Sequence, residues 1–201
     1  MTGTVITRYD LLMGRWEPNA RGRLEQAALE LYRERGFDST TVAEIAERAG
    51  LTERTFFRHY ADKREVLFGG AGMLQDMLVT CVREAPAQLA AMEAIIAALV
   101  AVAEGVFEER RDFARQRQAV IASNTELQER EVVKLATLAG AVAGALRERG
   151  VGDPAASLAA EAGMAVFKVA FERWVSQPAS AGKPLAAYLR ECAADLKLAV
   201  T

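Results

Sequence analysis

The chain has 201 residues, of which 51% are hydrophobic and 26% are charged, and its formal net charge is −2. This length suits one or two domains with a sizeable core. The charge balance argues against a protein that coats nucleic acid by charge alone. Residues 1–68 hold as many acidic as basic side chains, eleven of each. Any affinity for DNA must therefore come from local placement.

The composition also favours helices and a cytoplasmic location. Ala, Leu, Glu and Arg dominate, and all four are good helix formers or neutral in helices. The most apolar run, residues 94–103, is too short to cross a bilayer, and no signal-peptide pattern opens the chain. Cys81 and Cys192 lie far apart without metal-like spacing, which indicates reduced core thiols. We therefore expect a soluble protein with no membrane contact.

The first elements follow one another closely. Residues 1–20 have no sustained hydrophobic period and are interpreted as a flexible N-terminal arm. Apolar residues then recur at helical spacing and predict a helix over 21–35 that ends at Gly36. Thr41 with Glu44 forms a capping-box pattern that begins a second helix.

A glycine turn joins this helix to a third one. Gly50 follows an apolar inner face, and Thr52 is placed to cap a helix over 53–60. The three helices predict a helix-turn-helix domain over 21–66, in which the third helix enters the major groove of DNA.

Helices continue through the rest of the chain. Asp62 with Glu65 predicts a capping box for a long fourth helix that runs to about Arg83. The remaining predicted helices cover residues 87–109, 112–122, 126–149, 154–176 and 184–200. No strand pattern is present, so we predict an all-α fold of about nine helices, with a helical effector-binding and dimerisation domain over 67–201.

The third helix has two different faces. Phe56 and Tyr60 share the inward side with Leu51. The opposite side carries Glu53, Arg54, Phe57 and Arg58. Arginine recognises guanine edges or phosphates, glutamate accepts from cytosine, and hydroxyls of Thr52 and Thr55 lie where a helix N-terminus favours phosphate. The alternative for each residue alone is an ordinary solvated face.

Two further residues at this site need an explanation. A cation at Lys63, in the first turn of the predicted fourth helix, opposes the helix dipole, and a phosphate ligand would explain it. The alternative is a tolerated surface lysine. His59 is the only histidine, and no nucleophile is arranged with it, so we expect a phosphate contact or a structural hydrogen bond.

Residues 21–68 resemble the TetR family of one-component transcriptional regulators. The motifs that carry the resemblance are Gly36-Phe37, Thr41-Val42, Ile45-Ala46, Ala49-Gly50, Thr52, Thr55 through Tyr60, and Lys63. The resemblance implies a homodimer that binds a palindromic operator, usually as a repressor, and releases it when a small molecule binds the C-terminal domain.

The resemblance also implies DNA contacts at matching positions, namely Thr41, Thr52, Thr55, Phe57, His59 and Lys63. Phe57 departs from the family pattern, because a tyrosine that meets a phosphate is usual there. Arg54 departs as well, since a small residue is common at its position, and it adds a possible DNA contact.

Two stripes of residues near the C-terminus predict a dimer interface. Their 4-3-4 spacing suits close helix packing, and two helices from each subunit would form a four-helix interface. The stripes comprise Ala156, Ala160, Gly163, Phe167, Ala170 and Trp174, and Leu185, Leu189, Cys192 and Leu196. The alternative is that one or both stripes face the core of their own chain.

The middle helices predict an apolar or amphipathic effector site. Methionine and aromatic side chains suit adaptable apolar pockets, although each is also an ordinary core residue. The candidates are Met73, Met77, Met92, Ile96, Phe107, Phe113, Met164 and Phe171. Arg115 or Arg117 would pair with an acidic ligand head if either pointed inward.

Rival functions are less well supported by the residues. Acid–base groups occur at Glu104, Glu108, Glu109 and Arg110. Their spacing is better explained by a solvent-exposed helix end. We therefore expect that the protein is not an enzyme and binds no cofactor or metal. A non-specific architectural DNA protein would need a strongly basic balance. An activator of the same fold stays open.

Overall fold

The computed structural model describes residues 20–177 and 182–200. Within these ranges every regular element is helical, which confirms the predicted all-α fold, and each of the nine predicted helices has a counterpart. The predicted N-terminal arm lies outside the described residues, apart from Ala20.

The chain divides into two compact units. The first unit comprises residues 1–70 with 116–128, and the second comprises residues 71–115 with 129–201. The sequence predicted a boundary after residue 66 and gave no sign that a later segment joins the first unit. That segment holds the end of one long helix and the start of the next, so both helices contribute residues to both units.

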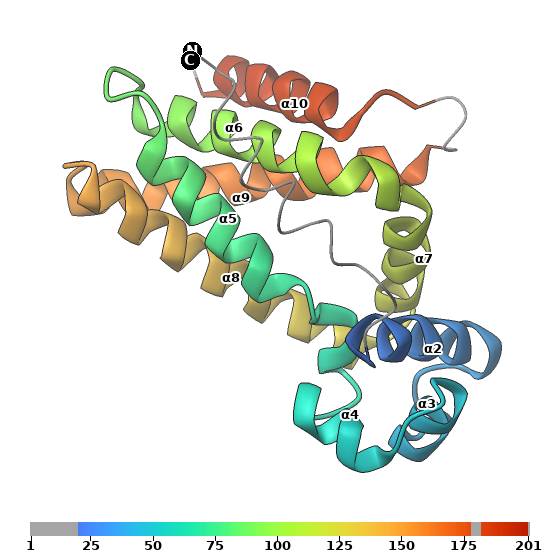
Figure 1. The fold of residues 1–201 in the computed structure, drawn as a ribbon. Coiled ribbons are helices and arrows are strands. Elements are labelled where there is room, and N and C mark those ends of the chain that lie inside the picture. Colours follow the sequence, from blue (N-terminus) through green and yellow to red (C-terminus); the bar gives the residue numbers. More distant parts are fainter. Residues whose placement is uncertain (1–19, 178–181, 201) are drawn as a thin grey trace. The chain divides into compact units, whose positions relative to one another are not determined.

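Three helices open the first unit: α2 (Ala20–Arg35), α3 (Val42–Arg48) and α4 (Glu53–His59) (Figure 1). Their core comes from one side of each helix, with Leu24, Ile45 and Phe56 fully buried. Gly36 has a φ of +86°, which favours glycine and stops α2 as the sequence predicted.

The predicted long fourth helix is interrupted. A short 3₁₀ turn, η1 (Glu65–Phe68), is followed by two glycines, and α5 (Ala71–Glu84) begins only after them. Asp62 does cap a helical turn, because its carboxylate accepts from the backbone N–H groups of Arg64 at 2.8 Å and Glu65 at 3.2 Å. The turn that it caps is η1, so the expected continuous helix to Arg83 is corrected.

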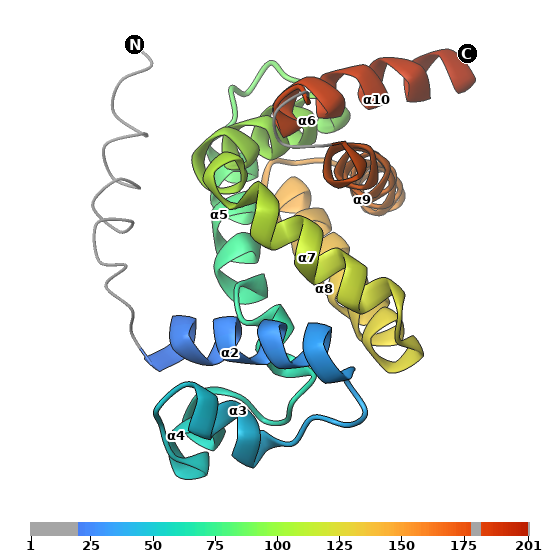
Figure 2. The ribbon, with the colours of Figure 1, turned by 90° about the vertical axis from the view of Figure 1, so that its right-hand side faces the viewer.

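The second unit is built from longer helices. Besides α5, its helical segments are α6 (Ala91–Val102), the π-helical turn η2 (Ala103–Phe107), the 3₁₀ turn η3 (Glu108–Arg110), the start of α7 (Arg111–Ala122), most of α8 (Thr125–Glu148), α9 (Asp153–Ser176) and α10 (Leu185–Ala199). The expected single helix over 87–109 therefore begins later and changes helix type twice. Helix α6 packs against α5, α9 and α10, and α9 packs against α10 (Figure 2).

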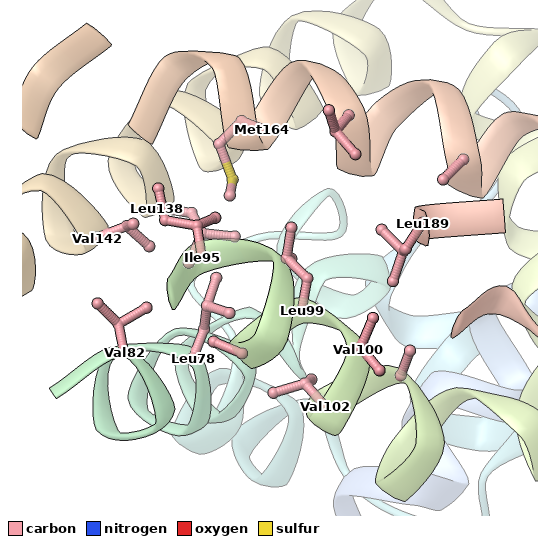
Figure 3. Packing of buried hydrophobic residues seen from close by; sticks show 14 of the residues in the cluster. Leu78, Val82, Ile95, Leu99, Val100, Val102, Leu138, Val142, Met164 and Leu189 are labelled. Atoms are coloured by element: carbon pink, nitrogen blue, oxygen red, sulfur yellow. The ribbon is translucent and has the colours of Figure 1, made fainter. Parts of the chain in front are cut away.

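The core of the second unit fills the space between these helices. Met164 of α9 points toward Ile95 of α6 and Leu138 of α8, and Leu78 and Val82 of α5 approach from the other side (Figure 3). All five side chains are buried. Close packing of this kind makes the unit sensitive to a change of even one methyl group.

The predicted dimer stripes belong to this core. In a single chain the side chains of both stripes are buried except those of Phe167 and Leu196, which are partly buried. Ile95 lies so close to Gly163 that a Cβ there would be 2.5 Å from its Cγ2 atom. These stripes therefore face their own chain, and their assignment to a subunit interface is corrected. The 4-3-4 spacing correctly predicted close helix packing, and the helices that pack belong to the same chain.

Two stretches satisfy the length and hydropathy criteria for a membrane span. They are Glu65–Glu84 and Asp153–Ser176, each with a mean hydropathy of 1.2. Core helices of globular proteins meet the same criteria, and the second stretch supplies Trp174 and Ala160 to the core. These criteria alone therefore do not indicate a membrane protein.

Candidate nucleic-acid interface

The turn between α3 and α4 is fixed by backbone geometry and by one arginine. Gly50 has a φ of +64°, and the N–H group of Leu51 donates to the carbonyl of Ala46 at 2.8 Å. Arg23 of α2 donates to the carbonyls of Ala49 and Gly50. A left-handed residue with these bonds ends α3 sharply, and the arginine ties the turn to the supporting helix.

Both short helices begin at side-chain caps. The hydroxyl of Thr41 accepts from the N–H of Glu44, whose carboxylate accepts from the N–H of Thr41, so the predicted capping box is confirmed. The hydroxyl of Thr52 accepts from the N–H of Thr55 at 3.2 Å and caps α4. Contacts of these three threonines with phosphate stay predictions.

The buried side of α4 orients its exposed side. Phe56 is fully buried, and Tyr60, which ends the helix, is 4% exposed. The Tyr60 hydroxyl donates to the buried carboxylate of Glu25 at 2.9 Å and accepts from Arg21 at 3.3 Å. Burial, reinforced by the negative charge of Glu25, raises the pKa of Tyr60, so the phenol keeps its proton. The start of α4 is therefore capped by Thr52, and its end is bonded to α2 through Tyr60.

The opposite side of α4 is open to solvent, as predicted. Glu53, Arg54, Phe57 and Arg58 are all exposed, and Phe57 is exposed to 55%. The Phe57 ring therefore contributes apolar surface to this face. Among the described residues, neither Arg54 nor Arg58 has a hydrogen-bonding or ion-pair partner. This face therefore offers two uncommitted guanidinium groups beside an apolar ring.

Other cations of the first unit are committed to partners. Arg48 bridges Glu34 at 2.9 Å and Glu30 at 3.5 Å, and its hydrogen bond lowers the pKa of Glu34. Arg35 pairs with Glu44 at 2.9 Å and Arg64 with Asp62 at 2.6 Å. Arg33 donates to Gln116 at 2.8 Å. Within the described part of this unit, the unpaired cations are therefore concentrated on α4.

Lys63 has partners that the sequence did not predict. Its ammonium donates to the carbonyls of Phe37, Asp38 and Thr40 at 2.8, 3.2 and 3.0 Å, and it lies 4.4 Å from the centre of the Phe37 ring. The lysine thus holds the loop between α2 and α3. A DNA contact at Lys63 stays a prediction, but an unmatched charge no longer supports it.

His59 is partly buried at the end of α4. Its Nε2 atom is buried and has no hydrogen-bond partner among the described residues. Burial and then the charges of Arg58 and Arg21 lower the pKa of His59, so its imidazole is neutral near pH 7. A contact of His59 with phosphate stays a prediction.

The predicted effector residues are scattered around the core of the second unit. Met164 is buried, Met73 is 41% exposed, and the others are partly buried. Phe107 and Phe171 come together, with ring centres 5.9 Å apart, and both also contact the Trp174 ring. A ligand-lining role for the full set stays a prediction.

Both arginines suggested for an acidic ligand head have protein partners. Arg115 pairs with Asp112 at 3.3 Å, and Arg117 donates to the carbonyl of Leu67 at 2.6 Å over the Phe68 ring. Among the described residues the buried arginine is Arg111, which is 7% exposed. Sequence reasoning missed it, because the predicted helix began at residue 112 and α7 begins at Arg111.

Two family models match this chain. One, described as "Bacterial regulatory proteins, tetR family", matches residues 25–68, and the other, "MftR C-terminal domain", matches residues 89–200. The first match covers the helices that carry the exposed α4 face.

Relatives and solved structures agree with these matches. The regulator TcmR of Streptomyces glaucescens is 35% identical over 82 residues, which are 41% of this chain and 36% of TcmR. A Mycobacterium tuberculosis protein assigned as the mycofactocin biosynthesis regulator MftR is 29% identical over 121 residues, 60% of each chain. The chain thus spans less than two thirds of either relative.

A solved structure shows the same fold. The transcriptional repressor FadR of Thermus thermophilus, in complex with lauroyl-CoA, is 27% identical and has a TM-score of 0.52 over 86% of this chain and 90% of that protein. With a family model that matches more than half of its length and a helix-turn-helix that matches another, the chain belongs to the TetR family of transcriptional regulators.

Proposed function

We propose that the protein is a ligand-responsive repressor that binds a palindromic operator as a homodimer. The observation that carries the proposal is the exposed face of α4, where Arg54 and Arg58 are unpaired among the described residues. An arginine without a protein partner is free to bind guanine or phosphate, and the buried Phe56 holds the helix in position.

The palindrome and the dimer support each other geometrically. One chain supplies one recognition helix, and two half-sites about 34–36 Å apart require a second copy. The candidates for DNA contact are Thr41, Thr52, Glu53, Arg54, Thr55, Phe57, Arg58, His59 and Lys63. We place base contacts at Arg54 and Arg58 and assign Lys63 mainly to support of the domain, because its ammonium already binds three carbonyls.

We place the dimer interface on the outward face of α9. Its outward face carries an apolar strip, with Leu158 exposed to 71% and Val169 to 48%, beside exposed charged side chains. Large apolar side chains exposed together on one face can mark a protein–protein contact, and a second copy would bury this strip. Leu158→Arg with Val169→Arg should yield monomers in sedimentation experiments, whereas the parent should be dimeric. A parent that sediments as a monomer at micromolar concentration would contradict the dimer.

We propose that the effector is small and apolar or amphipathic. The lauroyl-CoA bound to FadR supports an effector with an acyl chain. An effector that favours a dimer with the wrong spacing of its two α4 helices weakens DNA binding, and DNA weakens effector binding equally. Such couplings are typically about 1–3 kcal/mol.

DNA binding tests the proposal directly. Genome-wide pulldown followed by footprinting should yield one discrete palindromic site. Arg54→Ala and Arg58→Ala should each weaken binding to it by about 1–3 kcal/mol. Arg33→Ala is the matched control, because Arg33 is exposed in the same unit but bonded to Gln116, and it should change binding little. Equal, weak affinity for every duplex would refute the proposal and favour an architectural protein.

An activator of the same fold is the alternative outcome. Recognition of the operator is the same in both cases, so a reporter gene decides between them. Loss of the protein should raise transcription from the operator if it is a repressor and lower it if it is an activator. Either result is compatible with a cytoplasmic protein that meets DNA directly and has no catalytic role.

A further inference from the structure

A buried arginine in the second unit lacks a counter-charge. Arg111 begins α7, is 7% exposed, and has no ion-pair partner among the described residues. Its Nε atom is buried without a hydrogen-bond acceptor. Burial of an unpaired charge is costly, so such a group normally has an anionic partner.

Helix capping explains only part of this arrangement. The Nη2 atom of Arg111 donates to the carbonyl of Trp174 at 2.8 Å, and this carbonyl lies in the last turn of α9, where main-chain acceptors lack helical partners. The guanidinium thus caps α9 with one donor. The remaining donors and the charge are not accounted for by this bond.

The indole of Trp174 has the same unmet requirement. Trp174 is fully buried, and its Nε1 atom has no acceptor among the described residues. The guanidinium of Arg111 lies 5.3 Å from the centre of the indole ring. Buried tryptophans usually find an acceptor for this N–H group. Two buried donors from neighbouring side chains therefore lack an oxygen.

An apolar surface adjoins these donors. Phe107 contacts Phe167, Phe171 and Trp174, with ring centres 6.1, 5.9 and 6.1 Å apart. Phe107 ends the π-helical turn η2, and such turns occur frequently at functional sites. Gly182 lies directly against the guanidinium, where a Cβ would collide with it.

The geometry points to a binding site for an amphipathic carboxylate, whose head is held by Arg111 and Trp174 and whose apolar chain packs on Phe107, Phe167 and Phe171. The carboxylate supplies the missing charge and two acceptor oxygens, and a guanidinium binds carboxylates in a defined planar geometry. This inference rests on the proposed ligand response and names the chemistry of its effector.

Trp174 provides the signal for the test. The chain has two tryptophans, so Trp16→Phe leaves Trp174 as the only one. The full-length Trp16→Phe protein is titrated with decanoate, with decan-1-ol and with decanoyl-CoA, while Trp174 fluorescence and the thermal unfolding midpoint are recorded. Decanoate should change the fluorescence, raise the midpoint, and bind at least tenfold more tightly than decan-1-ol.

Substitution of the arginine should remove this preference. In the same background, Arg111→Gln should bind decanoate at least tenfold more weakly and leave decan-1-ol unaffected. Arg115→Gln is the matched control, because Arg115 is exposed one turn further along and paired with Asp112, and it should leave both affinities unchanged. If Arg111→Gln does not fold, the comparison of decanoate with decan-1-ol on the parent decides the matter.

Several results would overturn the inference. These are equal affinity for decanoate and decan-1-ol, or decanoate binding that survives Arg111→Gln in a folded protein. Tight binding of decanoyl-CoA that is insensitive to Arg111→Gln would also overturn it and assign the effector to acyl thioesters held elsewhere. Operator binding is measured separately without ligand. Its failure alongside selective decanoate binding would sink the proposed function but leave the site intact.

Discussion

The outer side of helix α4 in the first unit is mostly charged, whereas the outer side of helix α9 in the second unit carries an apolar strip beside its charges. Phe56 and Tyr60 fasten α4, and its exposed side carries charges that water or DNA can solvate. In α9, Ala160 and Trp174 are buried while Leu158 remains open. This difference is the reason for which we propose DNA as the partner of α4 and a second copy of the chain as the partner of α9.

Lys63 in the first unit and Arg111 in the second also differ in how completely the protein satisfies them. Lys63 lies in the first turn of the predicted fourth helix, where the dipole disfavours positive charge, and Arg111 is the first residue of α7. Lys63 donates to three backbone carbonyls, which satisfies all its donors. Arg111 donates to one acceptor among the described residues, the carbonyl of Trp174, and its buried Nε atom has none. Lys63 therefore has a structural role in the first unit, whereas Arg111 is a candidate ligand contact in the second.

Adjacent phenylalanines provide the strongest test of the two sides of α4. Phe56→Ala leaves a cavity in the core of the first unit and should cost about 3–5 kcal/mol of unfolding free energy. Phe57→Ala removes an exposed ring and should change stability by less than about 0.5 kcal/mol. Urea unfolding measures both effects, and Phe57→Ala should still weaken operator binding. Comparable destabilisation by the two substitutions would contradict the assigned faces.

A single added methyl group tests the inward face of α9. In Gly163→Ala the new Cβ would lie 2.5 Å from the Cγ2 atom of Ile95, so the core must shift, at a cost of about 1–3 kcal/mol. Glu161→Ala, on the exposed side, is the control and should be nearly neutral. Thermal unfolding at constant protein concentration separates the two. A neutral Gly163→Ala that instead changes the sedimentation of the protein would restore the stripe to a subunit interface.

The sequence predicted the first unit better because its signals are local. A capping box at Thr41 and a left-handed Gly50 act on neighbouring atoms, so the pattern determines the geometry. The faces of α9 could not be assigned from spacing alone. The 4-3-4 spacing of Ala156, Ala160, Gly163 and Phe167 is repeated by Leu158, Ala162, Ala165 and Val169. Periodicity marks a packed face but not the molecule that covers it. Arg111 donates to the carbonyl of Trp174, which is 63 residues away in the sequence. A contact between residues so far apart cannot be predicted from a local sequence pattern.

Lys63→Met separates a structural lysine from a phosphate contact. It retains most of the apolar stem and removes the ammonium, so the loop between α2 and α3 loses charged hydrogen bonds worth roughly 1.5 kcal/mol. Stability should fall while the slope of operator affinity against salt stays constant. Arg58→Met is the comparison, with stability retained and binding weakened. A slope that decreases by about one in Lys63→Met would show that the ammonium also neutralises a phosphate.

The titration of His59 gives the smallest effect and links the fold to DNA. Burial lowers its pKa below the usual 6.5, so the unfolded chain takes up this proton more readily than the folded one, and stability should decrease as the pH falls through about 6.5. A phosphate at the imidazole would favour the protonated form. Operator binding should then take up a proton and strengthen between pH 7.5 and 6, relative to His59→Gln at matched salt. If both proteins show the same pH dependence of operator affinity, the imidazole does not contact a phosphate. Its lowered pKa is then a property of the folded first unit without DNA.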